Sequence, residues 1–401
     1  MKRLLGALVL GIGILLSSVS SDAVTPRSVV GSQGECIIGL GTCGVVFPTS
    51  GAIICDGTGA NLDCPQLFSP DFADESGLRF YGVTNRTNPP RYIVSIDGGV
   101  TWGLLTTQPY TGAVDNLGAT IAVSSSGVII APANQGANNC IFRISIDKGV
   151  SWSTAYTDTS ATDNCGLAFG APVANNARCA QLSGYCAVIN PAGGGAFNFT
   201  TYYSNDNGIN WTKGSPTDSV VSSDQLQIKL DNSGVDGVVG VGQMSNGNGP
   251  VYKLGDVFRE GTGYAWAGAR CFGSVMMSAT QLICGPDNAA RTVYQNFQVG
   301  GGLAVLNNTF TLADAPLFGN SPNFHVEAYS SSIAYLFGRN LAGTKINVYI
   351  TTDAFVSTML LVQLTPTTAL LACYGESHKW GGNIYFTCGG SGANAFLGRL
   401  Q

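Results

Sequence analysis

The octapeptide SIDGGVTW occupies residues 95–102, and the same pattern returns as SIDKGVSW at 145–152 and SNDNGINW at 204–211. The shared pattern is S-x-D-x-G-x-[TSN]-W, and its aspartates are separated by 50 and 59 residues. A repeat of roughly 40–50 residues is typical of stacked or radial architectures. The pattern therefore predicts a chain built from similar consecutive units.

Each octapeptide suits a tight turn between two strands. The aspartate accepts hydrogen bonds from backbone N–H groups, and the glycine allows a positive φ. The tryptophan buries a large ring as the next strand begins. Apolar or alternating residues precede each copy, at 91–95, 140–145 and 197–204. We expect the turns to be built by Ser95, Asp97, Gly99, Trp102, Ser145, Asp147, Gly149, Trp152, Ser204, Asp206, Gly208 and Trp211.

These segments resemble the Asp-box, or BNR, repeat of sialidase-like β-propellers. The resemblance implies that each copy lies between the third and fourth strands of a four-stranded blade. Asp256 in VYKLGDVF and Asp353 in VYITTDAFVST are expected to mark degenerate copies. With the strand pairs between them, the chain is predicted to be an all-β, seven-bladed β-propeller, with six blades as the alternative. The segment ECIIGL (35–40) is expected to add the fourth strand of the last blade and close the ring.

The N-terminus has the features of an export signal. Lys2 and Arg3 precede a short apolar run at 4–16, and small residues follow at 21–23. We predict a signal peptide at 1–23, a short linker at 24–34 and a single propeller domain at 35–401; a membrane-anchoring N-terminal helix is the alternative for the first segment. No later segment is apolar enough to span a bilayer. The mature chain is expected to be secreted, periplasmic or at the cell surface.

All twelve cysteines follow the predicted signal, and an even number in an exported chain indicates disulfides. Their intervals suggest local pairs, although the sequence does not fix the connectivity. The suggested pairs are Cys36–Cys43, Cys55–Cys64, Cys140–Cys165, Cys179–Cys186, Cys271–Cys284 and Cys373–Cys388. With no C-x-x-C pair and two histidines, neither a metal site nor a cofactor is expected.

Charged residues make up only 11% of the chain, against roughly 25% in an average domain. The hydrophobic fraction of 45% is sufficient for a folded core. The net charge is −5 and no basic cluster is present, which argues against binding to nucleic acid.

Catalytic motifs are poorly represented. The resemblance implies that a sialidase would need an arginine triad, a tyrosine–glutamate pair and an aspartate. Phe142–Ser145 (FRIS) resembles the segment of the first arginine but runs directly into a box, which disfavours this activity. Another glycoside hydrolase would need two carboxylates flanking the scissile bond. Asp115, Asp163 and Asp224 are the candidates near one rim.

Polar loops suggest binding instead. Seven predicted loops between second and third strands each contain asparagine, whose amide suits hydroxyl-rich ligands. A polar and aromatic patch near them is predicted from Tyr110, Asp115, Asn116, Tyr156, Asp163 and Asn164. The first hypothesis is a non-catalytic propeller that binds a glycan or an extracellular protein, as in adhesion. The second is a glycoside hydrolase acting on a neutral polysaccharide. The third, a resemblance to propellers that assist assembly of photosynthetic complexes, fits the cysteine content less well.

Overall fold

The computed structural model describes two N-terminal strands and much of the chain from residue 67 to residue 400. The described residues are 27–31, 34–38, 67–84, 90–99, 102–112, 120–134, 140–159, 177–191, 199–213, 220–222, 228–230, 238–240, 243–244, 251–254, 257–260, 271–278, 281–286, 293–300, 303–312, 314, 324–342, 344–364, 377–380, 383–389 and 395–400. Every regular element among them is a β-strand. Within these ranges we find no helix of the length and apolarity needed to cross a membrane.

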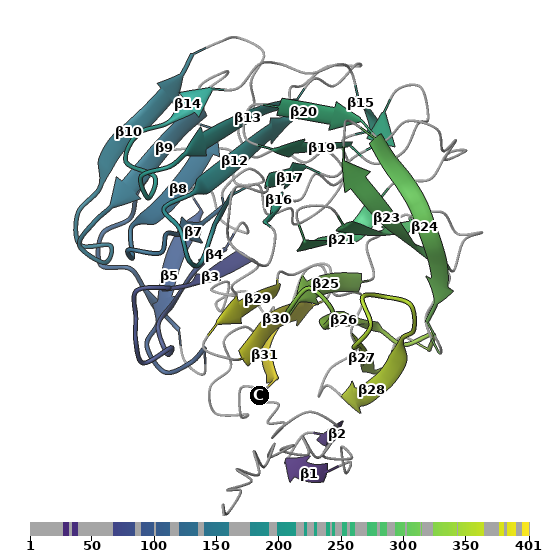
Figure 1. The fold of residues 1–401 in the computed structure, drawn as a ribbon. Helices are drawn as coiled ribbons and strands as arrows, with labels where there is room; N and C mark the ends of the chain where they lie inside the picture. Colours follow the sequence, from purple (N-terminus) through teal and green to yellow (C-terminus); the bar gives the residue numbers. More distant parts are fainter. Residues whose placement is uncertain are drawn as a thin grey trace, which may run out of the picture.

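Three antiparallel four-stranded sheets follow one another, each with its strands in sequence order (Figure 1). The first contains β3 (Leu67–Pro70), β4 (Phe80–Thr84), β5 (Arg91–Ser95) and β6 (Gly103–Leu104). The second contains β7 (Ala122–Val123), β8 (Ile129–Asn134), β9 (Cys140–Ser145) and β10 (Ser153–Asp158). The third contains β11 (Ala177–Cys179), β12 (Cys186–Pro191), β13 (Phe199–Ser204) and β14 (Thr212–Lys213).

Shorter paired strands come next, followed by another four-stranded sheet. The pairs are β15 (Val220–Ser222) with β18 (Gln243–Met244), β16 (Ile228–Leu230) with β17 (Val238–Gly240), and β19 (Val251–Leu254) with β20 (Val257–Glu260). The sheet contains β21 (Cys271–Ser278), β22 (Gln281–Pro286), β23 (Val293–Gly300) and β24 (Leu303–Thr311).

Two sheets complete the chain. One contains β25 (Phe324–Ala328), β26 (Ala334–Arg339), β27 (Ile346–Thr351) and β28 (Met359–Leu364), extended at its outer edge by β2 (Gly34–Ile38) and β1 (Arg27–Gly31). The last contains β29 (Ser377–Trp380), β30 (Asn383–Gly389) and β31 (Ala395–Leu400).

The predicted place of the N-terminal strand is wrong. Gly34 in β2 pairs with Leu364 in β28, so this strand joins the sheet of β25 to β28 and not the last sheet. Residues 24–34, predicted as a linker, include β1, which pairs with β2. Both β28 and β31 offer an outer edge with free backbone hydrogen-bonding groups. An apolar strand pattern alone does not distinguish between two such edges.

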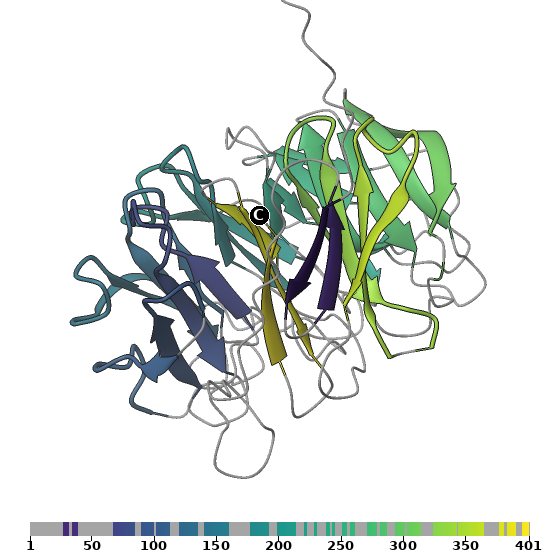
Figure 2. The same ribbon diagram turned by 90° about the horizontal axis from the view of Figure 1, so that it is seen from below.

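The strands that begin successive sheets lie side by side and form a closed ring. The contacts run from β3 to β7, β11, β16, β21, β25 and β29, and β29 returns to β3. Figure 1 shows the sheets around a common centre, and Figure 2 shows the last sheet, in yellow, between the first sheet and β25 to β28. Sheets that radiate from a ring of inner strands form a β-propeller.

Side chains join the last sheet to the first. His378 Nε2 lies 2.9 Å from the carbonyl oxygen of Phe68, and the two rings meet edge to face with centroids 4.9 Å apart. Tyr385 packs edge-on against Phe80, with ring centroids 4.6 Å apart. All four side chains are buried. The ring is therefore closed by aromatic packing together with a hydrogen bond to the backbone of β3.

The turns at 95–102, 145–152 and 204–211, which we call box turns, share one hydrogen-bond pattern. In the second, Ser145 Oγ donates to Asp147 Oδ1 at 2.8 Å and accepts from the Gly149 N–H at 2.8 Å. Asp147 also accepts from the N–H and the hydroxyl of Ser151, at 2.9 and 2.5 Å. The corresponding serine–aspartate and glycine–serine bonds are 2.8 and 2.9 Å in the first turn and 2.7 and 2.9 Å in the third.

A fourth box turn, at 351–358, makes the same bonds with different side chains. Thr351 Oγ1 donates to Asp353 Oδ1 at 2.8 Å and accepts from the Phe355 N–H at 2.9 Å. The N–H and hydroxyl of Ser357 donate to Asp353 at 2.9 and 2.6 Å. Phe355 takes the glycine position, with φ of 68°, and its ring is fully buried. Sequence alone identified only the aspartate, because the other positions hold different residues with equivalent donors.

The degenerate copy predicted around Asp256 is not a box turn. Leu254 in β19 pairs directly with Val257 in β20, so only two residues connect the strands. Those two residues, Gly255 and Asp256, lie outside the described part of the chain. Glycine and aspartate are also favoured in two-residue hairpins. The residue types at this position therefore did not show whether the turn is a box turn or a two-residue hairpin.

The tryptophan of each box turn packs against the preceding sheet. Trp211 meets Phe142 of the second sheet edge to face, with centroids 4.8 Å apart. Trp152 packs on the core between the first and second sheets, and its Nε1 donates to the Thr107 carbonyl at 3.0 Å. Trp102 packs on the cluster shared by the first and last sheets. Where the tryptophan position holds Thr358, Phe355 provides the buried aromatic ring from the middle of the turn.

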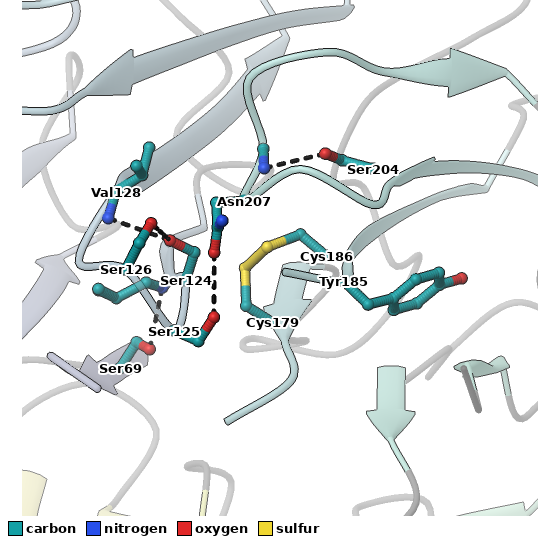
Figure 3. Close-up of a disulfide and its surroundings, with 12 residues drawn as sticks. Ser69, Ser124, Ser125, Ser126, Val128, Cys179, Tyr185, Cys186, Ser204 and Asn207 are labelled. Atoms are coloured by element: carbon teal, nitrogen blue, oxygen red, sulfur yellow. Dashed lines mark hydrogen bonds between the residues drawn. A yellow bond between two sulfur atoms is a disulfide. The ribbon is translucent and has the colours of Figure 1, made fainter. Parts of the chain in front are cut away.

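The predicted disulfide between Cys179 and Cys186 is present, with an S–S distance of 2.05 Å, and Cys140 is also disulfide-bonded. Figure 3 shows that the Cys179–Cys186 bridge lies beside the third box turn. Ser125 of the second sheet reaches this region, with its Oγ 3.0 Å from Asn207 Oδ1. Among the residues with described side chains, no cysteine is free.

Replacing Phe355 by glycine is expected to destabilise the protein by about 1–4 kcal/mol. Loss of a buried aromatic ring costs about 3–5 kcal/mol, and relief of the positive φ returns about 1–2 kcal/mol. Denaturant unfolding measures the difference. Ala354→Gly is the matched control, since Ala354 also has a positive φ of 55° but is only half-buried, and it should be neutral or stabilising. Adding Thr358→Trp to Phe355→Gly should recover part of the loss, whereas an unchanged Phe355→Gly variant would contradict the anchoring role.

The box carboxylates should make stability sensitive to acid. Hydrogen bonds from Ser151 and Ser145 lower the pKa of Asp147 from 3.8 to about 2. Because the folded pKa lies below the unfolded value, this stabilisation is complete above about pH 4 and is lost as the pH falls toward about 2. Thermal unfolding of Asp147→Asn should show a lower Tm near neutral pH and a smaller decrease between about pH 4 and pH 2. The same acid dependence in both proteins would argue against this carboxylate.

Candidate functional site

A polar network crosses the centre of the ring. Arg178 in β11 donates from Nη2 to both carboxylate oxygens of Glu327 in β25, at 3.0 and 3.2 Å. These strands belong to sheets that do not adjoin along the ring, so the ion pair spans the space that the inner strands enclose. Ser377 in β29 donates to Glu327 Oε2 at 3.0 Å. The Arg178 and Glu327 side chains are 11% and 7% exposed, so the pair is largely removed from solvent.

Successive side chains of a strand point to opposite faces, so those of β29 alternate between the two neighbouring sheets. Ser377 and Lys379 face the sheet of β25 to β28, whereas His378 between them faces the first sheet. Lys379 Nζ donates to the Tyr329 carbonyl at 2.6 Å and lies 4.6 Å from the centroid of that ring. Burial lowers the pKa of Lys379, and the nearby carboxylate of Glu327 partly offsets this effect.

This axial network, formed by Arg178, Glu327, Ser377 and Lys379, connects the third sheet to the last two. Each charge in it has a fixed partner, which makes the network suited to holding the sheets in place. Sequence reasoning missed it because Arg178 and Glu327 are 149 residues apart. The available signal was a charged residue within the short apolar segments that form β11 and β25, where an unpaired charge would be costly.

Tyr110, predicted to lie in an exposed ligand-binding patch, is a core residue. Its side chain is 3% exposed, and its hydroxyl lies 2.7 Å from the Ala131 carbonyl and 2.8 Å from the Ile141 carbonyl. Burial raises the pKa of Tyr110 well above its usual range. The prediction placed Tyr110 in a loop upstream of Asp115 and Asn116, but its hydroxyl and ring pack against the second sheet.

Tyr156 is half-buried in β10 and packs against Phe142 and Tyr202, with both centroid distances 5.4 Å. It belongs to the core between the second and third sheets, whereas Tyr110 belongs to the core between the first and second. The two tyrosines therefore do not form one patch. The remaining predicted ligand-binding or catalytic residues lie outside the described part of the chain: Asp115, Asn116, Asp163, Asn164 and Asp224.

A second ion pair, also missed from the sequence, joins the second and third sheets. Lys213 Nζ in β14 lies 2.6 Å from Asp158 Oδ2 at the end of β10. The Tyr202 hydroxyl donates to the same oxygen at 2.7 Å. Asp158 is buried. Its carboxylate thus fixes the outer strand of one sheet to two strands of the next.

Among the carboxylates whose side chains the structure describes, all except exposed Glu75 accept hydrogen bonds from structural partners. The box aspartates bind their own turns, Asp71 accepts from the Ala73 N–H at 3.1 Å, and Asp314 accepts from Gln363 Nε2 at 2.7 Å. Within the described ranges, no group of three or more His, Cys, Asp or Glu side chains could hold a metal ion. The hydrogen bonds of these carboxylates thus stabilise turns and contacts between sheets.

No family model matches the sequence, and no curated protein matches it. Solved structures share its fold. YCF48 bound to a D1 peptide is 13% identical, with a TM-score of 0.55 over 90% of this chain and 98% of that one. A GH74 enzyme from Niastella koreensis is 14% identical, with a TM-score of 0.50 over 83% of this chain and 52% of that one. A protein from Lactobacillus plantarum is 12% identical, with a TM-score of 0.50 over 77% and 87%. At these identities the likeness establishes a β-propeller fold.

Removing one partner of the axial ion pair should be strongly destabilising. Glu327→Ala leaves the Arg178 guanidinium buried without its anion, for which about 3–5 kcal/mol is expected. The double variant Arg178→Met, Glu327→Leu removes both charges and should recover most of that loss. Denaturant unfolding of Arg178→Met, Glu327→Leu and the double variant gives the coupling free energy. Additive effects would show that the pair contributes no coupling across the ring.

Proposed function

We propose that the protein is an exported, non-catalytic β-propeller that binds a polypeptide ligand through the loops opposite the box turns. The observation that carries this proposal is the commitment of the described carboxylates to turns and inter-sheet contacts. A glycoside hydrolase needs two carboxylates about 5–9.5 Å apart beside the scissile bond. A propeller that uses its acids to hold the fold is suited to binding. The fold likeness to YCF48, solved with a bound peptide, supports a polypeptide as the ligand.

We propose seven blades with turns of the Asp-box type. The inner strands β3, β7, β11, β16, β21, β25 and β29 follow one another around the ring, which supports this number. The blade between the third sheet and β21 would consist of β16, β17, β19 and β20, since β17 contacts β19. A six-bladed arrangement would require one of these inner strands to lie outside the ring.

Export is supported by the Cys179–Cys186 and Cys140 disulfides, because disulfides persist in oxidising compartments. We therefore retain the signal peptide at 1–23, with the propeller from residue 35 to 401, as a proposal. For the ligand site we propose Asp115, Asn116, Asp163 and Asn164, which precede the second and third sheets in the sequence. Tyr110 is excluded by its burial.

The secreted protein should bind members of a peptide array without releasing sugar from any neutral polysaccharide. Asp115→Asn combined with Asp163→Asn should weaken peptide binding by about tenfold, as loss of a central contact does, with no change in Tm. Tyr110→Phe is the matched control: it removes a buried hydroxyl, so Tm should fall while affinity stays constant. Binding is measured by titration calorimetry.

The competing outcomes are distinct. Sugar release that disappears in Asp115→Asn or Asp163→Asn would establish the hydrolase. Selective retention on a glycan array with no peptide bound would replace the polypeptide by a glycan. Unchanged peptide affinity in the double variant would move the site away from these two loops.

A further inference from the structure

The box turns and the connections between the first two strands of each sheet lie on one face, which we call the box face. Backbone bonds join the two kinds of turn within single sheets: Gly98 N to Leu78 O at 2.8 Å, Asn207 N to Gly184 O at 2.7 Å, and Ala354 N to Ser332 O at 2.9 Å. Ser125 links neighbouring sheets on this face, since its Oγ lies 2.8 Å from the Ser183 carbonyl as well as near Asn207 (Figure 3).

Aliphatic side chains stand exposed on this face. The exposed residues are Leu78, Ile96, Ile146, Val150, Leu182, Ile209 and Val356. Leu182, Ile146 and Val356 are 75%, 74% and 74% exposed. They come from the first three sheets and from the sheet of β25 to β28. Exposed aliphatic side chains therefore occur on several turns of this face.

At the second position of a box turn the fold does not require an aliphatic residue. In a box turn the first, third, fifth and seventh residues make the hydrogen bonds, and the second and sixth point away. The second position is isoleucine in Ile96 and Ile146 but polar in Asn205 and Thr352. Polar residues therefore satisfy the turn equally well. Exposed apolar side chains that recur on one face indicate a contact surface.

The same face is acidic. Its charged residues are Asp71, Asp74, Glu75, Asp97, Asp147, Asp206 and Asp353, against Arg79, Lys148 and Lys379, whose Nζ reaches the Tyr329 carbonyl in the β25–β26 connection. Turn hydrogen bonds favour the ionised form of the box carboxylates, as the lowered pKa of Asp147 shows. Negative charge thus stays beside the aliphatic side chains at neutral pH. A second copy of this chain would present the same sign of charge, and so would an anionic lipid surface; both are disfavoured by like-charge repulsion.

We propose that the box face is a docking surface for a polypeptide that presents lysine or arginine side chains together with apolar ones. Charge complementarity would guide the approach, and the aliphatic side chains would be buried in the contact. This surface lies on the opposite face from the loops of the proposed function, and it stands independently of that proposal.

Two peptides of equal length test the charge requirement, one alternating Lys with Leu and one alternating Glu with Leu. Titration calorimetry on the full secreted protein should detect the Lys/Leu peptide only, with affinity that falls as NaCl is raised. Ile146→Ser, Leu182→Ser and Val356→Ser together should weaken binding by about tenfold. Leu341→Ser is the matched control, since Leu341 is 62% exposed but lies between β26 and β27, at the other ends of the strands. Its affinity should match that of the parent.

Several results would overturn the proposal. Equal binding of the Glu/Leu peptide would show that charge makes no contribution. Unchanged affinity of the triple variant for the Lys/Leu peptide would show that the aliphatic side chains make none. Sedimentation of the protein with phosphatidylserine vesicles, lost in the triple variant, would identify a lipid surface as the occupant. A concentration-dependent dimer in analytical ultracentrifugation, also lost in the triple variant, would identify a second copy. Because Asp115 and Asp163 are unchanged in all these variants, failure here leaves the loop-face proposal unaffected.

Discussion

Closure of the ring where the last sheet meets the first is the contact on which the other inter-sheet contacts depend. The last sheet contains three strands among the described residues, so its contact with the first sheet is made largely by side chains. Trp380 packs edge-on against Phe72 with centroids 5.4 Å apart, and His378 reaches the backbone of Phe68. Gly77 has φ of 64° and lies against Trp380, so a residue with a side chain would be strained there. Separation at this boundary would expose apolar surface on both sheets and release every sheet from its circular constraint.

The same requirement for close contact explains why the box glycines matter beyond the turn. A Cβ on Gly149 would lie 2.9 Å from Leu105 of the first sheet, and one on Gly208 would collide with Ile130 of the second. Glycine is therefore required by the positive φ and also by the approach of the preceding sheet. In the fourth box turn the aromatic ring moves from the eighth position to Phe355, and the same boundary is filled from a different part of the turn. What recurs is an aromatic side chain buried against the preceding sheet.

Sequence reasoning succeeded where a local pattern has one physical solution. Ser, Asp, Gly and Trp at fixed spacing identify a turn because each residue meets a separate demand. It failed around Asp256, where glycine and aspartate fit a two-residue hairpin equally well. Tyr110 was misplaced because its surroundings come from the next sheet. Arg178 and Glu327 could not be paired without the ring that brings their strands to opposite sides of one centre.

The axial network has a consequence for where binding can occur. With the guanidinium of Arg178 bonded to both oxygens of Glu327, and Lys379 bonded to the Tyr329 carbonyl, the charges at the centre are engaged with one another or with backbone. A ligand that entered there would have to break a largely buried ion pair, and the charge left behind would carry a high desolvation cost. The proposed binding on the two faces of the ring would leave this ion pair intact. The inner strands then serve to hold the loops of one face and the box turns of the other in fixed positions.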